Sequence, residues 1–191
     1  MTPDDNNVNI ETRPYHHGEL RAALITEGLR LLAARDVEAL SLREVARNVG
    51  VSATAVYRHF SDKDALMTAL AHEGLTRLAQ AQHAAAAAAG GGNGAEAFAA
   101  TGRAYVRFAL ANPALFRLIF AAPPRTRCGE EPAALAFLRA NAAAAARRQD
   151  GGSSDVRVRA VAAWAQVHGL AMLMLDGQIP VDESLIDAVV R

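Results

Sequence analysis

The sequence predicts an all-α protein of about nine helices, and three observations support this fold class. Clusters of proline and glycine divide the 191 residues into segments, and within each segment the apolar residues recur with helical spacing. No segment shows the sustained alternation of apolar and polar residues that is typical of strands. Hydrophobic residues make up 51% of the chain, so it can bury a core, as one domain or as two small ones.

The N-terminal part is expected to be a flexible arm followed by a helix. Residues 1–14 are polar and acidic and contain no apolar stretch of the kind found in signal peptides. From about residue 18 to residue 34 the spacing becomes helical. The side chains expected to face inward from this helix are Leu20, Leu24, Leu31 and Leu32.

A helix-turn-helix is predicted between residues 41 and 60. The sequence SLRE at residues 41–44 is a capping box, in which the hydroxyl of Ser41 and the carboxylate of Glu44 satisfy free amides at a helix start. This helix is expected to stop at Gly50, and Ser52 is expected to cap the next one, which runs to about His59. The apolar side chains expected to pack beneath the motif are Leu42, Val45, Ala46, Val49, Val51, Val56 and Phe60.

The second helix of such a motif enters the DNA major groove, so its outer residues are candidate contacts. Tyr57, His59 and Lys63 suit contacts to phosphates, which position a protein on the duplex. The alternative is a plain helical hairpin, in which Tyr57 covers the core and Lys63 is only a solvated residue at a helix start.

Base reading requires short or bidentate side chains. Thr54 and Arg43 are the candidates for base edges, and Ala53 and Ala55 are the candidates for thymine methyl groups. The complete predicted DNA-binding set is Ser41, Arg43, Ser52, Ala53, Thr54, Ala55, Tyr57, Arg58, His59 and Lys63.

The rest of the chain is expected to form further helices. A fourth helix begins with Ser61 as its N-cap and ends in a glycine loop near residues 90–94. The next helix stops at Asn112 and Pro113, and a short apolar helix follows to about residue 120. A loop over 121–132 precedes helices over about 133–148, 155–176 and 182–190. We therefore expect a DNA-binding domain over residues 15–62 and a regulatory and dimerisation domain over residues 63–191.

The joint pattern of the first helices resembles the TetR family of bacterial one-component regulators. The resemblance rests on SLREVA at residues 41–46, VGVS at 49–52 and VYRHFSDKDAL at 56–66, with YHHGEL at 15–20 as a typical opening of the first helix. It implies that helices one to three form the DNA-binding head and that Tyr57, His59 and Lys63 touch the DNA backbone.

The C-terminal half resembles a tryptophan–histidine–glycine type of regulatory domain found in that family. The matching segments are WAQVHG at residues 164–169 and NPALFRLIF at residues 112–120. This likeness implies a regulatory core able to enclose a ligand. The predicted function is that of a repressor released from its operator by a small, largely apolar effector.

The helix over 155–176 is apolar almost all round, so it must be buried on several sides. We expect a homodimer formed through this helix and the last one, because a symmetric dimer places two heads about 34–36 Å apart on a palindromic operator. The candidate effector-binding side chains are Tyr105, Phe108, Phe116, Phe120, Trp164, His168 and Met172. The alternative is that these residues are ordinary core, with the histidine satisfied by a hydrogen bond.

No motif for catalysis, a cofactor or a metal is found. A glycine-rich phosphate loop, a His-Glu-x-x-His helix and a nucleophile elbow are all missing from the sequence, and histidines 16, 17, 72 and 83 lack metal-ligand spacing. Lys and Arg total 20, as do Asp and Glu, so the net charge does not indicate a nucleic acid partner. The single cysteine, Cys128, cannot form an internal disulfide, which fits a cytoplasmic protein.

The sequence leaves three alternatives to an effector-controlled regulator. The helix-turn-helix regulator could be controlled by a protein partner. It could also respond to oxidation of Cys128, which lies among arginines that lower a thiol pKa. A helical enzyme is the third alternative, and the missing motifs argue against it.

Overall fold

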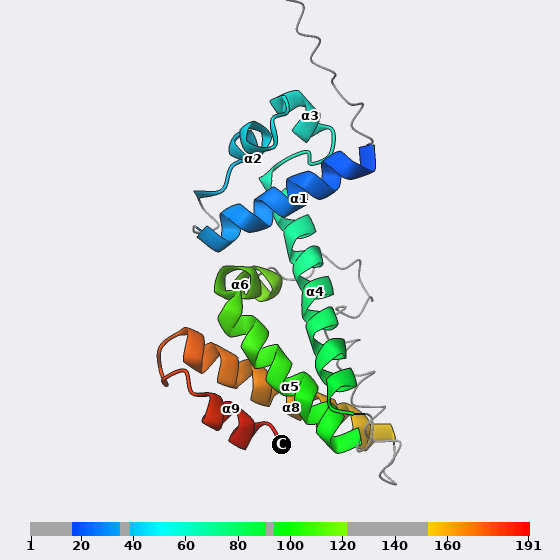
Figure 1. Cartoon of the computed structure of the whole chain (residues 1–191), viewed down its shortest axis with the longest axis vertical. Coiled ribbons are helices and arrows are strands. Elements are labelled where there is room, and N and C mark those ends of the chain that lie inside the picture. The colour runs from blue at the N-terminus through cyan, green and yellow to red at the C-terminus, as the bar shows by residue number, and fades with distance from the viewer. Residues whose placement is uncertain (1–16, 35–38, 91–93, 122–152) are drawn as a thin grey trace, which may run out of the picture.

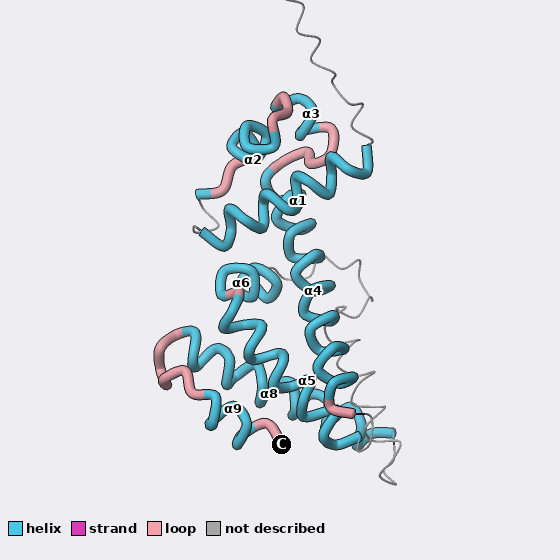
Figure 2. Tube along the Cα trace, in the orientation of Figure 1, coloured by secondary structure: helices cyan, strands magenta, loops and turns pink. Residues whose placement is uncertain are grey.

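The computed structural model describes residues 17–34, 39–90, 94–121 and 153–191, and these residues form eight helices and no strand (Figures 1 and 2). The all-α prediction is confirmed. The helices are α1 (His17–Ala34), α2 (Leu42–Val49), α3 (Ala53–Tyr57), α4 (Lys63–Ala88), α5 (Gly94–Ala111), α6 (Pro113–Ala121), α8 (Ser153–Leu175) and α9 (Glu183–Val189). The predicted arm over 1–14, the predicted loop over 121–132 apart from its first residue, and the predicted helix over 133–148 lie outside the described residues. Ala121, predicted to begin the loop, is the last residue of α6.

Helices α1 to α3 gather at one end of the molecule, and α4 runs from this head along the body formed by α5, α6, α8 and α9 (Figure 1). The predicted helix-turn-helix is confirmed. Ser41 caps α2 by accepting the amide N–H of Glu44 at 3.2 Å, and Gly50 ends it with a φ of 79°, which glycine adopts without strain. Ser52 caps α3 by accepting the N–H of Ala55 at 3.2 Å.

The predicted core of the head is also confirmed. Val45, Val56 and Phe60 are buried with Leu42 and Ala46, and Val49 and Val51 pack against them in part. The third helix is shorter than predicted, because it ends at Tyr57 and not at His59. The chain tightens into a turn there, with the amide of His59 bonded to the carbonyl of Val56, and this turn directs the Phe60 ring into the core.

The N-cap of α4 also differs from the prediction. Ser61 was predicted as its N-cap, but Asp62 is the cap, and its Oδ1 accepts the N–H of Ala65 at 2.7 Å. Ser61 instead donates its hydroxyl to Asp62 Oδ2 at 3.1 Å. A carboxylate one residue later fulfils the same capping role and adds negative charge at the positive end of the helix dipole.

Two buried clusters lie at the two ends of α4. The head cluster includes Leu66 and Leu70 from the first turns of α4, whereas the body cluster includes Leu78 from further along the same helix. Helix α4 therefore belongs to the core of both parts.

In the body, α5 packs against α4 on one side and against α8 on another. The predicted break between α5 and α6 is confirmed, because Asn112 donates its side-chain N–H to the carbonyl of Phe108 at 3.0 Å and Pro113 opens α6. Helix α8 begins at Ser153, two residues earlier than expected, and α9 follows with Asp182 as its N-cap.

Candidate nucleic-acid interface and aromatic cluster

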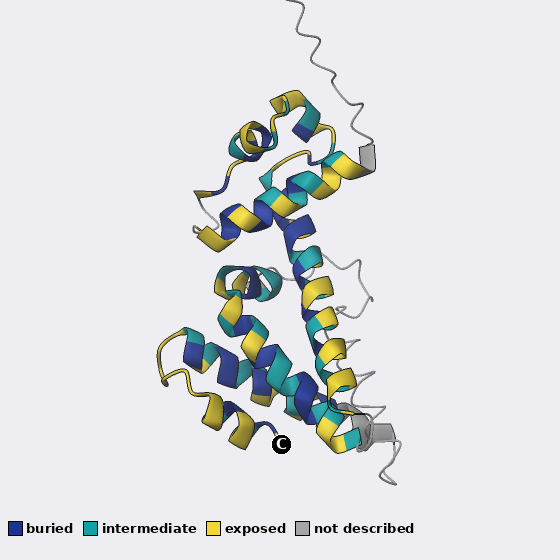
Figure 3. Ribbon diagram, viewed as in Figure 1, coloured by how far each residue is buried: buried dark blue, intermediate teal, exposed yellow. Residues whose placement is uncertain are grey.

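Helix α3 turns one face into the head core and the other towards solvent (Figure 3). Val56 is fully buried and anchors the helix, whereas the neighbouring Tyr57 is 49% exposed. Tyr57 therefore does not cover the core, as the hairpin alternative would require. The predicted contact residues of this region that are exposed are Ser41, Arg43, Ser52, Ala53, Thr54, Tyr57 and Arg58, and those partly exposed are Ala55, His59 and Lys63.

The side-chain oxygens of the two capping serines, Ser41 and Ser52, already accept one hydrogen bond each. Ser41 and Ser52 each use the side-chain oxygen to accept an amide of their own helix. A hydroxyl that accepts one hydrogen bond still has its O–H to donate, so both serines are able to donate to a phosphate oxygen. The caps thus hold the two hydroxyls at the N-terminal ends of α2 and α3.

A polar link between α1 and α2 was not predicted. Glu27 of α1 accepts hydrogen bonds from Asn48 of α2 at 2.7 Å and from Arg30 at 2.7 Å. The hydrogen bond from Arg30 lowers the pKa of the Glu27 carboxyl. The Glu27–Arg30 pair follows from helical spacing, but Asn48 is 21 residues away and its contact needs the tertiary fold.

A cation–π contact in the head was also missed by the sequence analysis. The guanidinium carbon of Arg21 lies 5.3 Å from the centre of the Phe60 ring. Phe60 was predicted as core, and it is buried, but one face of its ring is covered by an arginine of α1.

The body contains a chain of hydrogen bonds centred on Tyr105. The indole Nε1–H of Trp164 donates to the hydroxyl oxygen of Tyr105 at 3.2 Å, and this hydroxyl lies 2.9 Å from Nδ1 of His168. The tyrosine O–H is able to donate to Nδ1, and with this direction of the hydrogen bond the neutral imidazole carries its proton on Nε2.

Burial favours the neutral form of both titratable groups in this chain. It raises the pKa of Tyr105, although the hydrogen bond from Trp164 acts in the opposite direction. It lowers the pKa of His168. The three side chains therefore form a neutral polar link between α5 and α8.

Aromatic rings surround this link. Tyr105 meets Phe116 edge-on with centroids 5.4 Å apart, and the His168 ring lies 5.6 Å from Phe116 and 5.0 Å from Phe120. Phe108 and Met172 pack against the larger body cluster. The structure therefore brings five of the seven predicted effector-binding side chains into direct contact, namely Tyr105, Phe116, Phe120, Trp164 and His168, and it gives His168 the hydrogen-bond partner that the core alternative expects.

Helix α6 lies between the two buried clusters. Its Leu115 belongs to the head cluster, whereas the adjacent Phe116 is fully buried in the body cluster. The approach to α4 is close, because a Cβ added to Gly74 would lie 2.8 Å from Leu115 Cδ1 and 2.9 Å from Ile119 Cδ1. A shift of α6 would therefore change the packing of both the head cluster and the body cluster.

The described part of the chain was not predicted to hold a metal site or a membrane-spanning helix. No three His, Cys, Asp or Glu side chains gather there in a way that could hold a metal ion. One segment, Val158–Leu175, is long and apolar enough by length and composition to cross a membrane, but core helices of soluble proteins pass the same test. Only 28% of that segment is buried within the chain, so much of its apolar surface is uncovered.

A three-helix head with this turn, carried on a helical body, defines the class of helix-turn-helix DNA-binding proteins. Two family models match the chain. Residues 24–70 match the model described as bacterial regulatory proteins, tetR family, and residues 98–191 match the tetracyclin repressor-like C-terminal domain. The chain belongs to the TetR family, a family of transcription regulators and not of enzymes.

Individual proteins similar to this chain are also transcriptional regulators. HTH-type transcriptional regulators of Mycobacterium tuberculosis and Mycobacterium bovis are 31% identical over 105 residues, which cover 55% of this chain. The matched segment spans 45% of the length of those relatives, so the chain covers less than half of each.

Solved structures extend the likeness to the whole fold. A protein of unknown function from Rhodococcus sp. RHA1 is 34% identical, with a TM-score of 0.75 and 93% of each chain covered. A possible TetR family transcriptional regulator from Streptomyces coelicolor A3(2) is 24% identical, with a TM-score of 0.60 over 90% of this chain and 81% of that one. The second likeness shows the fold alone.

Proposed function

We propose that this chain is a cytoplasmic DNA-binding transcription regulator, a homodimeric repressor that a small, largely apolar effector releases from a palindromic operator. The observation that carries the proposal is the arrangement of α3. Val56 anchors this helix in the head core, while Thr54, Tyr57 and Arg58 are exposed. A short, capped helix with an exposed polar face suits insertion into a major groove.

Within this interface Tyr57, His59 and Lys63 contact phosphates, and Arg43 and Thr54 read base edges. Ser41, Ser52 and Arg58 complete the contacts to the backbone, and the methyl groups of alanines 53 and 55 face thymine. The supporting observation is that all ten residues retain solvent exposure in the folded head.

The test is operator binding by Tyr57→Ala and Lys63→Ala proteins on the promoter DNA beside the gene. Each variant is expected to bind more weakly on all sequences, and Lys63→Ala is expected to lower the salt slope by about 1. Arg77→Ala is the matched control, because it removes one positive charge about 21 Å further along α4. If Tyr57→Ala and Lys63→Ala bind like the wild type, the docking surface lies elsewhere.

The dimer rests on the uncovered apolar surface of α8. Val158, Val161 and Leu173 are 66%, 47% and 46% exposed, and Ala162 and Ala165 are exposed beside them. The opposite side of α8 packs into the body through other residues. Apolar surface of this kind on a regulator is best covered by a second copy, because a symmetric dimer also supplies the second head.

Sedimentation velocity at micromolar concentration tests the dimer. Ala165→Arg is expected to give monomers, because it places a charge in the middle of the buried surface. Ala84→Arg makes the same change at an exposed position of α4 and is expected to remain dimeric. A monomeric wild-type protein would contradict the proposal.

The effector site is assigned to the aromatic cluster around Tyr105 and His168. The link through α6 supports a regulatory role, because Phe116 contacts the ring of His168 while Leu115 packs in the head core. An effector that prefers one position of α6 would shift the population towards a state with weak DNA affinity.

A broad ligand screen tests this assignment. A true effector is expected to raise the melting temperature and to lower the operator affinity of the wild type, and both effects are expected to weaken in Phe120→Ala. If no compound changes both properties, the effector proposal fails while DNA binding stands.

A further inference from the structure

Helix α9 is too short to hold its position by itself. It has seven residues, and Ile186 is its one buried side chain, followed by the buried Val190 just after the helix. Isolated helices shorter than about 12–15 residues are marginal in water. Contacts from other helices must therefore fix where α9 lies.

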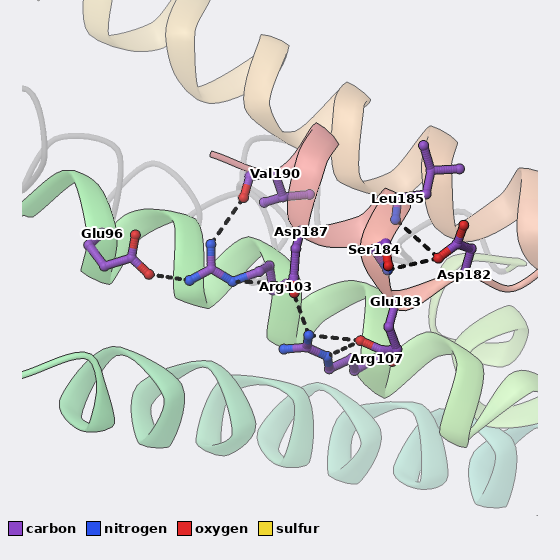
Figure 4. A network of polar contacts seen from close by, with 9 residues as sticks. All are labelled: Glu96, Arg103, Arg107, Asp182, Glu183, Ser184, Leu185, Asp187 and Val190. Atoms are coloured by element: carbon purple, nitrogen blue, oxygen red, sulfur yellow. Dashed lines mark hydrogen bonds and ion pairs between the residues drawn. The ribbon is translucent and has the colours of Figure 1, made fainter.

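Two arginines of α5 make polar contacts with α9, and we refer to Arg103 and Arg107 as the arginine clamp (Figure 4). The Arg107 guanidinium donates to Glu183 Oε2 at 2.9 Å through Nε and to Asp187 Oδ1 at 3.0 Å through a terminal nitrogen. One side chain thus holds two successive turns of α9. These carboxylates raise the pKa of Arg107, with the hydrogen bond to Glu183 as the largest cause.

The second arginine holds the C-terminal end of α9. Arg103 donates to the carbonyl oxygen of Val190 at 3.1 Å and lies 3.7 Å from Asp187, and it is itself held by an ion pair with Glu96. A cation at the last carbonyls of a helix also meets the negative end of the helix dipole. Gln166 of α8 donates to the preceding carbonyl, that of residue 189, at 2.9 Å.

The clamp and the effector cluster lie on opposite flanks of the same helix. Tyr105 stands two positions from each clamp arginine, and two positions on a helix correspond to a rotation of about 200°. Tyr105 contacts α6 and α8, whereas the arginines contact α9. A movement of α5 at Tyr105 would therefore also move Arg103 and Arg107.

We propose that Arg103 and Arg107 are positioning residues for the dimer surface. By holding α9 on α5 they fix it beside the exposed face of α8, where Gln166, the neighbour of Ala165, donates to the carbonyl of Val189. The affinity between two copies then depends on ionic contacts within each copy. This inference rests on the proposed dimer. It gives the proposed effector site a second effect, a change in dimer affinity, beside its effect on DNA binding by the heads.

The experiment compares dimer dissociation for the wild type and Arg107→Gln by sedimentation velocity from nanomolar to micromolar concentration. It is run at about 0.1 M and about 1 M salt, across which the Debye length falls from about 10 Å to about 3 Å. Loss of a partly exposed ionic network is expected to weaken the dimer about three- to tenfold at the lower salt and to reduce its dependence on salt. Arg77→Gln, which breaks an ion pair within α4, is the matched control and should leave both values unchanged.

A double-mutant cycle with Glu183→Gln separates positioning from direct contact. If the clamp acts through α9, the double variant should weaken the dimer no more than Arg107→Gln alone, because Arg107→Gln already removes the contacts to both Glu183 and Asp187. Additive effects would mean that the two residues touch the partner copy separately, and they would overturn the inference. Binding of each variant to a DNA fragment with one half-site is expected to match the wild type, which shows that the head stays folded.

The outcomes also distinguish this inference from the proposed function. A wild-type protein that is monomeric at micromolar concentration would overturn the dimer and the clamp together. A dimeric wild type whose affinity and salt dependence match those of Arg107→Gln would overturn the clamp alone.

Discussion

The hydroxyl of Tyr105 lies 2.9 Å from Nδ1 of His168, and it accepts the indole N–H of Trp164 at 3.2 Å. This one oxygen satisfies two polar groups of α8 at a place where apolar rings surround them. Buried polar groups cost free energy when they lose their partners. Tyr105 therefore supplies the polar link between α5 and α8.

Replacement of Tyr105 by phenylalanine is expected to lower the free energy of unfolding by about 1–3 kcal/mol, because both partners in α8 are left unsatisfied. Urea unfolding followed by the fluorescence of Trp164, the single tryptophan, measures the loss. Tyr57→Phe makes the same change at an exposed ring and is expected to stay within about 0.5 kcal/mol of the wild type. Equal stability of the two variants would show that water replaces the Tyr105 hydroxyl at no cost.

The depressed pKa of His168 predicts an acid-sensitive fold. Burial holds this pKa below the ordinary value of 6.5, so the unfolded chain takes up the proton before the folded chain does. The stabilisation is complete above pH 6.5, is lost as the pH falls through the window below 6.5, and changes no further beneath the folded-state pKa.

His168→Gln isolates this contribution. The difference in unfolding free energy between the wild type and the variant should be constant above pH 6.5 and should shrink below it. Urea unfolding at a series of pH values measures it. Parallel pH profiles for the two proteins would refute the assignment of the acid sensitivity to His168.

The link from Glu27 to Asn48 predicts that an acidic residue of α1 affects DNA binding without touching DNA. Glu27→Ala is expected to destabilise the head by about 1 kcal/mol, because it removes hydrogen bonds to a charged group, and to weaken operator binding as α2 loses its tie to α1. Chemical unfolding and a DNA titration measure the two effects.

Glu73→Ala is the control for this change. Glu73 pairs with Arg77 one turn along α4 and is 36% exposed, against 13% for Glu27. Its loss should cost about 0.5 kcal/mol or less and leave operator affinity unchanged. A Glu27 variant that behaves like the Glu73 variant would mean that the position of α2 does not depend on the hydrogen bond between Asn48 and Glu27.

Local sequence signals were sufficient to predict the head. Ser41, Gly50 and Ser52 act through neighbours three or four residues away, so their roles can be read from spacing alone. The same reasoning placed the α4 cap one residue too early, because Ser61 and Asp62 are both capping residues and only the backbone decides which one has the extended conformation.

Contacts that join distant segments could not be predicted in this way. Asn48 and Glu27 are 21 residues apart, and Arg107 and Glu183 are 76 apart, with the intervening chain giving no signal of either pair. The aromatic cluster was predicted as a set from its residue types. The order of its hydrogen bonds, with Tyr105 between Trp164 and His168, depends on how α5 and α8 face each other.

The tight passage of α6 across α4 gives a last prediction. A methyl group at Gly74 would lie within 2.9 Å of side-chain carbons of Leu115 and Ile119, so Gly74→Ala forces these buried or half-buried side chains of α6 to shift. Overpacking of this kind costs about 1–3 kcal/mol, more than the gain of about 1 kcal/mol from replacing glycine in a helix. Thermal unfolding measures the net loss.

Thr76→Ala is the control, because Thr76 is an exposed residue of the same helix, two positions from Gly74. It should gain up to about 0.7 kcal/mol from helix propensity, so the two substitutions are expected to differ in sign. Because α6 joins the aromatic cluster to the head, Gly74→Ala should also change operator affinity, whereas Thr76→Ala should not. A Gly74 variant with wild-type operator affinity and lowered stability would indicate that α6 supports the fold without passing its position on to the head.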